Sequence, residues 1–125
     1  MPKRILIVED EVSVRNALRT FLEHHSRFEL YEAANGAEAV DKASALQPDL
    51  LILDLSMPHM NGIEAASLLR CKLPLVPIIA YTMFGDVLGS SLASALGVAS
   101  IVSKSDGLPV LLARIESLLA SAPLR

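Results

Sequence analysis

Five short apolar runs, separated by longer stretches with helical periodicity, constrain the fold of this chain more than any other feature of its sequence. The first, third and fourth runs are apolar almost throughout, whereas a strand with one solvent-exposed face would alternate polar and apolar residues. Continuous runs of this kind are typical of strands covered on both faces of a parallel sheet. The predicted strands are Ile5–Val8, Phe28–Ala33, Leu50–Leu53, Val76–Tyr81 and Ala99–Ser103.

The stretches between the runs carry apolar residues at helical spacing. The predicted helical stripes are Val14, Ala17, Leu18, Phe21 and Leu22; Ala37, Val40 and Ala43; Ile63, Ala66 and Leu69; and Leu108, Leu111, Leu112, Ile115, Leu118 and Leu119. A further helix is predicted over Asp86–Leu96, and we expect it to be the least stable and the moving part, because glycine and serine are weak helix formers. Strict alternation of strand and helix predicts an α/β domain, with an open parallel sheet and helices on both faces.

Length, charge and cysteine content limit the number of domains, the class of partner and the cellular compartment that we expect. The 125 residues suffice for one domain with one core, and no linker divides them, so we expect a single domain over 1–125 without an effector domain. A net charge of −3 gives no basic surface for nucleic acid. The single cysteine, Cys71, fits a reducing compartment, and the apolar region Leu73–Phe84 is too short to span a membrane. We expect a cytoplasmic protein.

Chemically active side chains follow four of the five predicted strands. Glu9-Asp10-Glu11 follows the first strand, Asp54 the third, Thr82 the fourth and Lys104 the fifth. Each alone has an ordinary interpretation, as a helix-start acid, a cap, a β-branched residue or a solvated lysine. In an open parallel sheet, however, the carboxyl ends of the strands form one site. Carboxylates gathered there repel one another unless a cation lies among them, and Mg²⁺ prefers such oxygen ligands.

Four segments, "ILIVEDE", "LILDLSMPHMNG", "IIAYT" and "SIVSKS", together resemble the receiver domain of two-component response regulators. The resemblance covers the whole chain, and its most specific part is the D-x-x-M-P-x-M-N-G spacing that begins at Asp54. It implies a flavodoxin-like (βα)5 fold, doubly wound around a five-stranded parallel sheet of order 2-1-3-4-5. In that order the first and third strands are neighbours, so Asp10 and Asp54 would face each other.

The resemblance also implies a role for each residue of the site. Asp54 would accept a phosphoryl group from phosphohistidine, and Lys104 and Thr82 would contact that group after transfer. The resemblance implies that Mg²⁺ is held by Glu9, Asp10, Asp54 and the backbone carbonyl of Ser56. The domain would then be a bacterial, phosphorylation-controlled signalling switch rather than an ordinary enzyme, with self-catalysed transfer and slow autodephosphorylation.

The partners that the resemblance implies are a sensor histidine kinase or a phosphotransfer protein, with no direct contact to nucleic acid or membrane. A homodimer could form through the face of the fourth helix, the fifth strand and the last helix. The apolar patch predicted on that face comprises Leu88, Leu92, Ile101, Leu108 and Leu112, although these residues could equally belong to the core.

Three positions depart from the usual receiver pattern. Ile101 replaces an aromatic residue, Ser105 replaces a proline, and Met83 replaces a small residue after the threonine. We expect Met83 to cover part of the acceptor pocket and to slow the entry of attacking water. The departures bear on how the switch is transmitted and leave the acceptor, the metal-binding acids and the lysine intact.

The sequence also allows other interpretations. A degenerate receiver that binds partners without phosphorylation is the main alternative. A phosphatase of the haloacid-dehalogenase type would need an acid at position 56, where Ser56 stands, and a flavodoxin-type module would need a phosphate loop where Glu9-Asp10-Glu11 stands. We interpret His24 and His25 as residues at the end of a helix and His59 as a turn residue, not as metal ligands.

Overall fold

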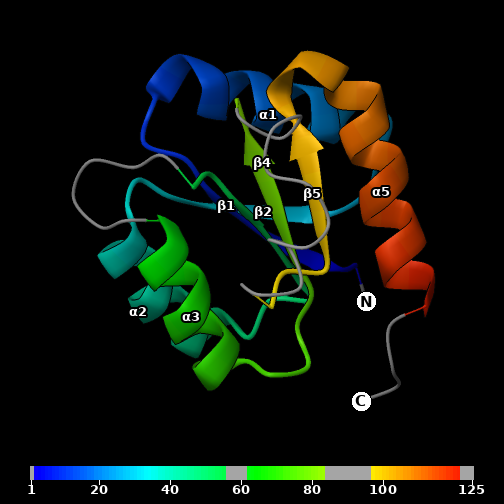
Figure 1. Ribbon diagram of the computed structural model, residues 1–125. Helices are drawn as coiled ribbons and strands as arrows, with labels where there is room; N and C mark the ends of the chain where they lie inside the picture. The colour runs from blue at the N-terminus through cyan, green and yellow to red at the C-terminus, as the bar shows by residue number, and fades with distance from the viewer. Residues whose placement is uncertain (1, 56–61, 84–96, 122–125) are drawn as a thin grey trace.

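The computed structural model describes residues 2–55, 62–83 and 97–121 as one α/β domain (Figure 1). Strands and helices alternate from β1 to β4, as predicted, and residues 84–96 between β4 and β5 lie outside the described part. The strands are β1 (Arg4–Val8), β2 (Glu29–Ala33), β3 (Leu50–Leu53), β4 (Ile78–Thr82) and β5 (Ser100–Ser103). The helices are α1 (Val12–His25), α2 (Gly36–Leu46), α3 (Gly62–Lys72) and α5 (Leu108–Ser121), with a 3₁₀ turn, η1 (Lys104–Asp106), after β5.

All five strands are parallel and lie in the order β2-β1-β3-β4-β5, which confirms the predicted topology. The predicted bounds differ from the observed ones by up to two residues. β4 begins at Ile78 rather than Val76, because Pro77 lacks an N–H to donate to the neighbouring strand, although its carbonyl accepts the Leu51 N–H at 3.0 Å. β4 also includes Thr82, which therefore ends the strand instead of following it.

Helices cover both faces of the sheet (Figure 1), and an apolar core layer lies between the sheet and the helices on each face. α2 and α3 cover one face, where Leu6, Leu51 and Ile78 point into the core. α1 and α5 cover the other face, where Ile7, Ile52 and their neighbours pack against the two helices. β3 has every residue buried, in agreement with its continuous apolar run. This central strand is thus fixed from both sides just before Asp54.

The buried face of α2 differs from the predicted stripe. Ala37 is exposed, whereas Gly36, Ala39 and Ala43 are buried. The helix is fixed at its start by Asn35, whose Oδ1 accepts the Glu38 N–H at 2.9 Å. With that start, positions 36, 39 and 43 face the sheet and Ala37 turns outward.

Several predicted features lie outside the described residues. These are the carbonyl of Ser56, His59 and the predicted helix Asp86–Leu96 with Leu88 and Leu92. Of the remaining predicted patch, Leu108 and Leu112 pack against the core between α5 and α1, and Ile101 packs against the α2–α3 layer. Within the described ranges, no helix combines the length and the apolar character that crossing a membrane requires.

Candidate functional site

Parallel pairing brings the predicted site residues to one edge of the sheet. Val8 and Leu53 are register partners in β1 and β3, so Glu9 and Asp54 leave the sheet side by side. The backbone continues the ladder past both strands, because the Asp54 N–H donates to the Val8 carbonyl at 3.0 Å. Thr82 pairs in register with Ser103, and Lys104 follows directly.

Three carboxylates converge at this edge. One ligand oxygen each from Glu9, Asp10 and Asp54 lies within 4.8 Å of the others. Glu9 is 2% exposed and Asp54 is 5% exposed, whereas Asp10 is half-buried. Two nearly buried carboxylates at this spacing are costly without a cation.

The donor set fits a small hard cation. Glu9 Oε1 is buried, and the group that it faces is the Lys104 ammonium, whose Nζ lies 2.9 Å away. Carboxylate oxygens are the ligands that Mg²⁺ takes in proteins, usually from one or two acids with several waters. The three side chains therefore offer the protein share of a magnesium site.

Lys104 supplies the positive charge at the site. Its Nζ lies 2.9 Å from Glu9 Oε1 and 3.3 Å from Asp54 Oδ2, and its side chain is only 14% exposed. Burial lowers the pKa of Lys104, but the two carboxylates raise it further, so the net pKa lies above the ordinary lysine value. The ammonium is therefore charged throughout the physiological range and bridges the first and third strand ends.

Glu9 is electrostatically perturbed. Burial is the main cause, with repulsion from Asp54 in support and Lys104 opposing, and together they raise the pKa of Glu9 from 4.5 to about 7. A carboxyl that titrates near neutrality at the base of an acidic cluster is typical of a functional site. A divalent cation would favour its ionised form.

Thr82 completes the set of predicted residues at this edge. It is fully buried at the end of β4, and its register partner Ser103 is also buried. The structure thus brings Glu9, Asp10, Asp54 and Lys104 together and ends β4 with Thr82 at the same edge.

An open cleft of about 340 Å³ lies beside Lys104, and sequence reasoning missed its walls. One wall comes from the start of α1 and the other from the ends of β4 and β5. The lining residues are Ser13, Val14, Ala17, Leu18, Tyr81, Met83, Lys104 and Leu108. No short motif encodes this cleft, because it arises where α1 packs near α5. Burial raises the pKa of the Tyr81 hydroxyl that lies here.

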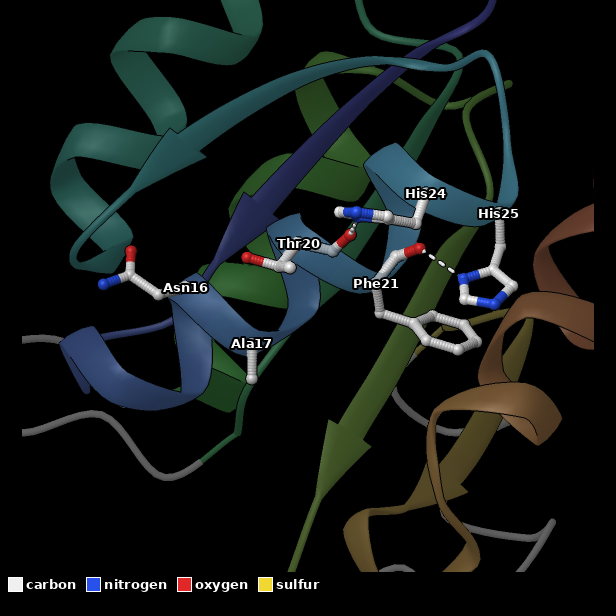
Figure 2. Close-up of a pocket in the computed structure, with 6 residues that line it drawn as sticks. All are labelled: Asn16, Ala17, Thr20, Phe21, His24 and His25. Atoms are coloured by element: carbon white, nitrogen blue, oxygen red, sulfur yellow. Dashed lines mark hydrogen bonds between the residues drawn. The ribbon is translucent and has the colours of Figure 1, made fainter.

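The two histidines of α1 lie away from this edge, on a shallow surface depression along the helix (Figure 2). Each imidazole Nδ1 is 2.9 Å from the backbone carbonyl four residues earlier, and the ring of His25 stacks on Phe21 with centroids 4.2 Å apart. Figure 2 shows the rings of His24 and His25 pointing in different directions. Both are thus engaged with their own helix.

A family model described as the response regulator receiver domain matches residues 5–116. Among curated proteins, the chain is 38% identical over 107 residues to a protein-glutamate methylesterase/protein-glutamine glutaminase of Carboxydothermus hydrogenoformans, covering 83% of this chain and 30% of the relative. It is 33% identical over 119 residues to the alkaline phosphatase synthesis transcriptional regulatory protein PhoP of Bacillus subtilis, covering 95% and 49%. The chain therefore spans less than half of either relative.

Solved structures agree in fold. The response regulator TrrA of Thermotoga maritima, solved in complex with Mg²⁺ and BeF, superposes with a TM-score of 0.83 at 34% identity, covering 93% of this chain and 98% of that one. The response regulator domain of Thermotoga maritima CheB gives a TM-score of 0.87 at 27% identity, covering 98% and 100%.

Proposed function

Because the chain belongs to the response regulator receiver domain family, whose members are phosphorylation-dependent signalling switches, we propose that Asp54 is its phosphoacceptor. The observation that carries the proposal is the convergence of Asp54, Glu9, Asp10 and Lys104 at one sheet edge. Asp54 directly follows β3, in which every residue is buried, so its carboxylate is held in place for attack on phosphorus. Its phosphorylation would be self-catalysed and would reverse by slow hydrolysis.

Each neighbour of Asp54 has a part in this proposal. Lys104, already 3.3 Å from Asp54 Oδ2, would neutralise a phosphoryl oxygen as the group arrives. Thr82 would donate its hydroxyl to another phosphoryl oxygen. Glu9, Asp10, Asp54 and the Ser56 carbonyl would hold Mg²⁺, which when bound neutralises negative charge on the phosphoryl oxygens. The close spacing of the Glu9, Asp10 and Asp54 carboxylates supports this ligand set.

The proposed donor is a sensor histidine kinase or a phosphotransfer protein, and the proposed compartment is the cytoplasm, where a kinase finds its ATP. The cleft beside Lys104 supports an approach from the α1 side, because it opens next to the ammonium. The target that reads the phosphorylated state is expected to belong to a partner or to an output domain, as in the longer relatives.

Intact-mass spectrometry after incubation with a small phosphodonor tests the proposal. The wild-type protein should gain one phosphoryl group in the presence of Mg²⁺ and none after chelation of the metal. Asp54→Asn should gain none while still melting cooperatively, which shows that the variant is folded. Consumption of many donor equivalents per chain would favour a phosphatase instead, and no gain at all would favour a degenerate receiver.

A further inference from the structure

Arg15, at the fourth position of α1, contacts the backbone of the turn that carries the Glu9 and Asp10 carboxylates. Its Nη1 donates to the backbone carbonyl of Glu9 at 2.7 Å. Its Nε lies 3.4 Å from Glu32 Oε1 on β2, and the Arg15 side chain is only 17% exposed. One guanidinium thus connects the residue that opens the acidic cluster to the edge strand of the sheet.

Glu9 is held at both of its backbone groups. Its N–H donates to the Ala33 carbonyl at 3.0 Å, as a continuation of the β1–β2 ladder, and its carbonyl accepts from Arg15. Beyond this point regular pairing ends, and the chain turns through Asp10 and Glu11 into α1. Glu11 is the N-cap residue of α1 but makes no capping hydrogen bond with its side chain. Two contacts therefore orient the turn: the Glu11 N–H donates to Glu9 Oε2 at 3.3 Å, and Arg15 donates to the Glu9 carbonyl at the shorter distance of 2.7 Å.

The position of Arg15 is unfavourable for a helix considered alone. A cation near the start of a helix opposes the helix dipole, which favours acids there. α1 has no acid in its first turn and carries Arg15 at the fourth helical position. A long, mostly buried cation at that position is explained by what it binds, namely the Glu9 carbonyl and the Glu32 carboxylate.

We propose that Arg15 is a positioning residue that orients the Glu9–Asp10 turn so that both carboxylates face Asp54 and can share a divalent cation. Glu32 holds the guanidinium in place, and it also accepts from Arg19 Nη1 at 3.0 Å. The contact acts on the Glu9 backbone and does not use the Glu9 carboxylate, whose Oε1 lies 2.9 Å from Lys104 Nζ and whose Oε2 accepts the Glu11 N–H at 3.3 Å. The inference rests on the proposed magnesium site and extends it to a residue outside the acidic cluster.

Arg19 provides a matched control. It lies one turn further along α1 and pairs with the same Glu32, but its guanidinium contacts Glu32 and Glu23 and not the Glu9 carbonyl. Arg15→Gln and Arg19→Gln thus remove the same charge from the same helix and from the same acidic partner. They differ in the contact to the metal-binding turn.

Magnesium affinity is measured on the full chain by following backbone amide chemical shifts in a Mg²⁺ titration, alongside thermal melting without metal. Arg15→Gln should weaken Mg²⁺ binding by about tenfold, the lower end of the range seen when groups that hold metal ligands are lost. Arg19→Gln should change the affinity by less than about twofold, as expected for an exposed ion pair. Arg15→Lys should fall between, because one ammonium reaches the carbonyl or Glu32 but does not match both contacts.

Equal Mg²⁺ affinity in Arg15→Gln and the wild type would overturn the inference, and so would an equal loss in Arg15→Gln and Arg19→Gln. If Arg15→Gln does not fold, Glu32→Gln takes its place, because it leaves Arg15 present but unanchored. That variant should bind Mg²⁺ more weakly than Arg19→Gln, and an unchanged affinity would contradict the inference. A wild-type protein that shows no Mg²⁺-dependent shifts at Glu9, Asp10 or Asp54 would overturn this inference together with the proposed metal site.

Discussion

The buried carboxyl of Glu9 should make the stability of the fold depend on pH. Its pKa rises from 4.5 to about 7 on folding, so between these pH values the folded chain holds a proton that the unfolded chain has released. The stability from this group is fully present below about pH 4.5 and is lost as the pH rises to about 7. The loss is at most about 3 kcal/mol, at 1.4 kcal/mol per pKa unit.

Chemical denaturation of metal-free protein across this pH range tests the shift. Glu9→Gln keeps the shape of the side chain but does not titrate, so the stability difference between variant and wild type should grow in the variant's favour from pH 4.5 to 7. In the wild type, Mg²⁺ should bind more weakly as the pH falls below about 7, because the cation competes with the Glu9 proton. A pH-independent difference between the two proteins would show that Glu9 titrates normally.

Met83 is expected to affect the rate at which phosphorylated Asp54 is hydrolysed. It is 67% exposed and lines the cleft beside Lys104, two residues after Tyr81 on the same chain segment. If its side chain restricts the approach of water to the phosphoryl group, Met83→Ala should shorten the half-life of phosphorylated Asp54 several-fold. The half-life is read by intact mass after removal of the donor.

Leu75 offers a matched control for Met83, since it is 69% exposed and precedes the opposite end of β4. Leu75→Ala should leave the half-life unchanged. If Met83→Ala also leaves it unchanged, the cleft does not control hydrolysis.

At the scale of elements, Gly97 has a position that only glycine fits well. Its φ is +74°, and a Cβ there would lie 2.6 Å from Nε of Arg70 on α3. Gly97→Ala should therefore destabilise the fold by about 1–3 kcal/mol through the left-handed backbone alone, and by more through the clash. Urea denaturation measures the change.

Gly107 has a positive φ without a close neighbour, so it shows a backbone cost without a steric clash. Its φ is +91°, but a Cβ there would meet nothing closer than Pro109 Cδ at 3.7 Å. Gly107→Ala should thus report the backbone cost without a clash. In an Arg70→Ala background the cost of Gly97→Ala should fall to the cost of its own backbone conformation, whereas an unchanged cost would show that Arg70 moves aside freely.

The strands were predictable from the sequence because burial on both faces leaves continuous apolar runs, and β3 was predicted with its observed bounds. The outward turn of Ala37 was not, because a helical stripe of small residues leaves the rotation of the helix open until Asn35 fixes its start. The role of Arg15 was also hidden, since a backbone carbonyl that binds a side chain from the next element leaves no mark on the sequence. The convergence of Glu9, Asp10, Asp54 and Lys104 was predictable because all four directly follow strands of one parallel sheet, whose carboxyl ends meet at one edge.

At the scale of the whole molecule, the open question is whether phosphorylation changes assembly. On α5, Leu108 and Leu112 face the core, and the exposed apolar side chain is Val110, at 42%. We predict a shift toward dimer when a phosphoryl mimic such as beryllofluoride is added with Mg²⁺, measured by sedimentation velocity. Val110→Asp should weaken the shift if α5 lies in the interface, and an unchanged sedimentation coefficient in the wild type would argue against phosphorylation-driven dimerisation.

Asp54 is the proposed carrier of the phosphoryl group. The most direct test is to determine which residue of the chain carries that group. Borohydride reduces an aspartyl phosphate to homoserine, so phosphorylated protein can be reduced, digested and mapped by mass spectrometry. We expect homoserine at position 54, formed only with donor and Mg²⁺. Aspartate that stays unmodified at position 54, in protein that intact mass shows to be phosphorylated, would contradict it.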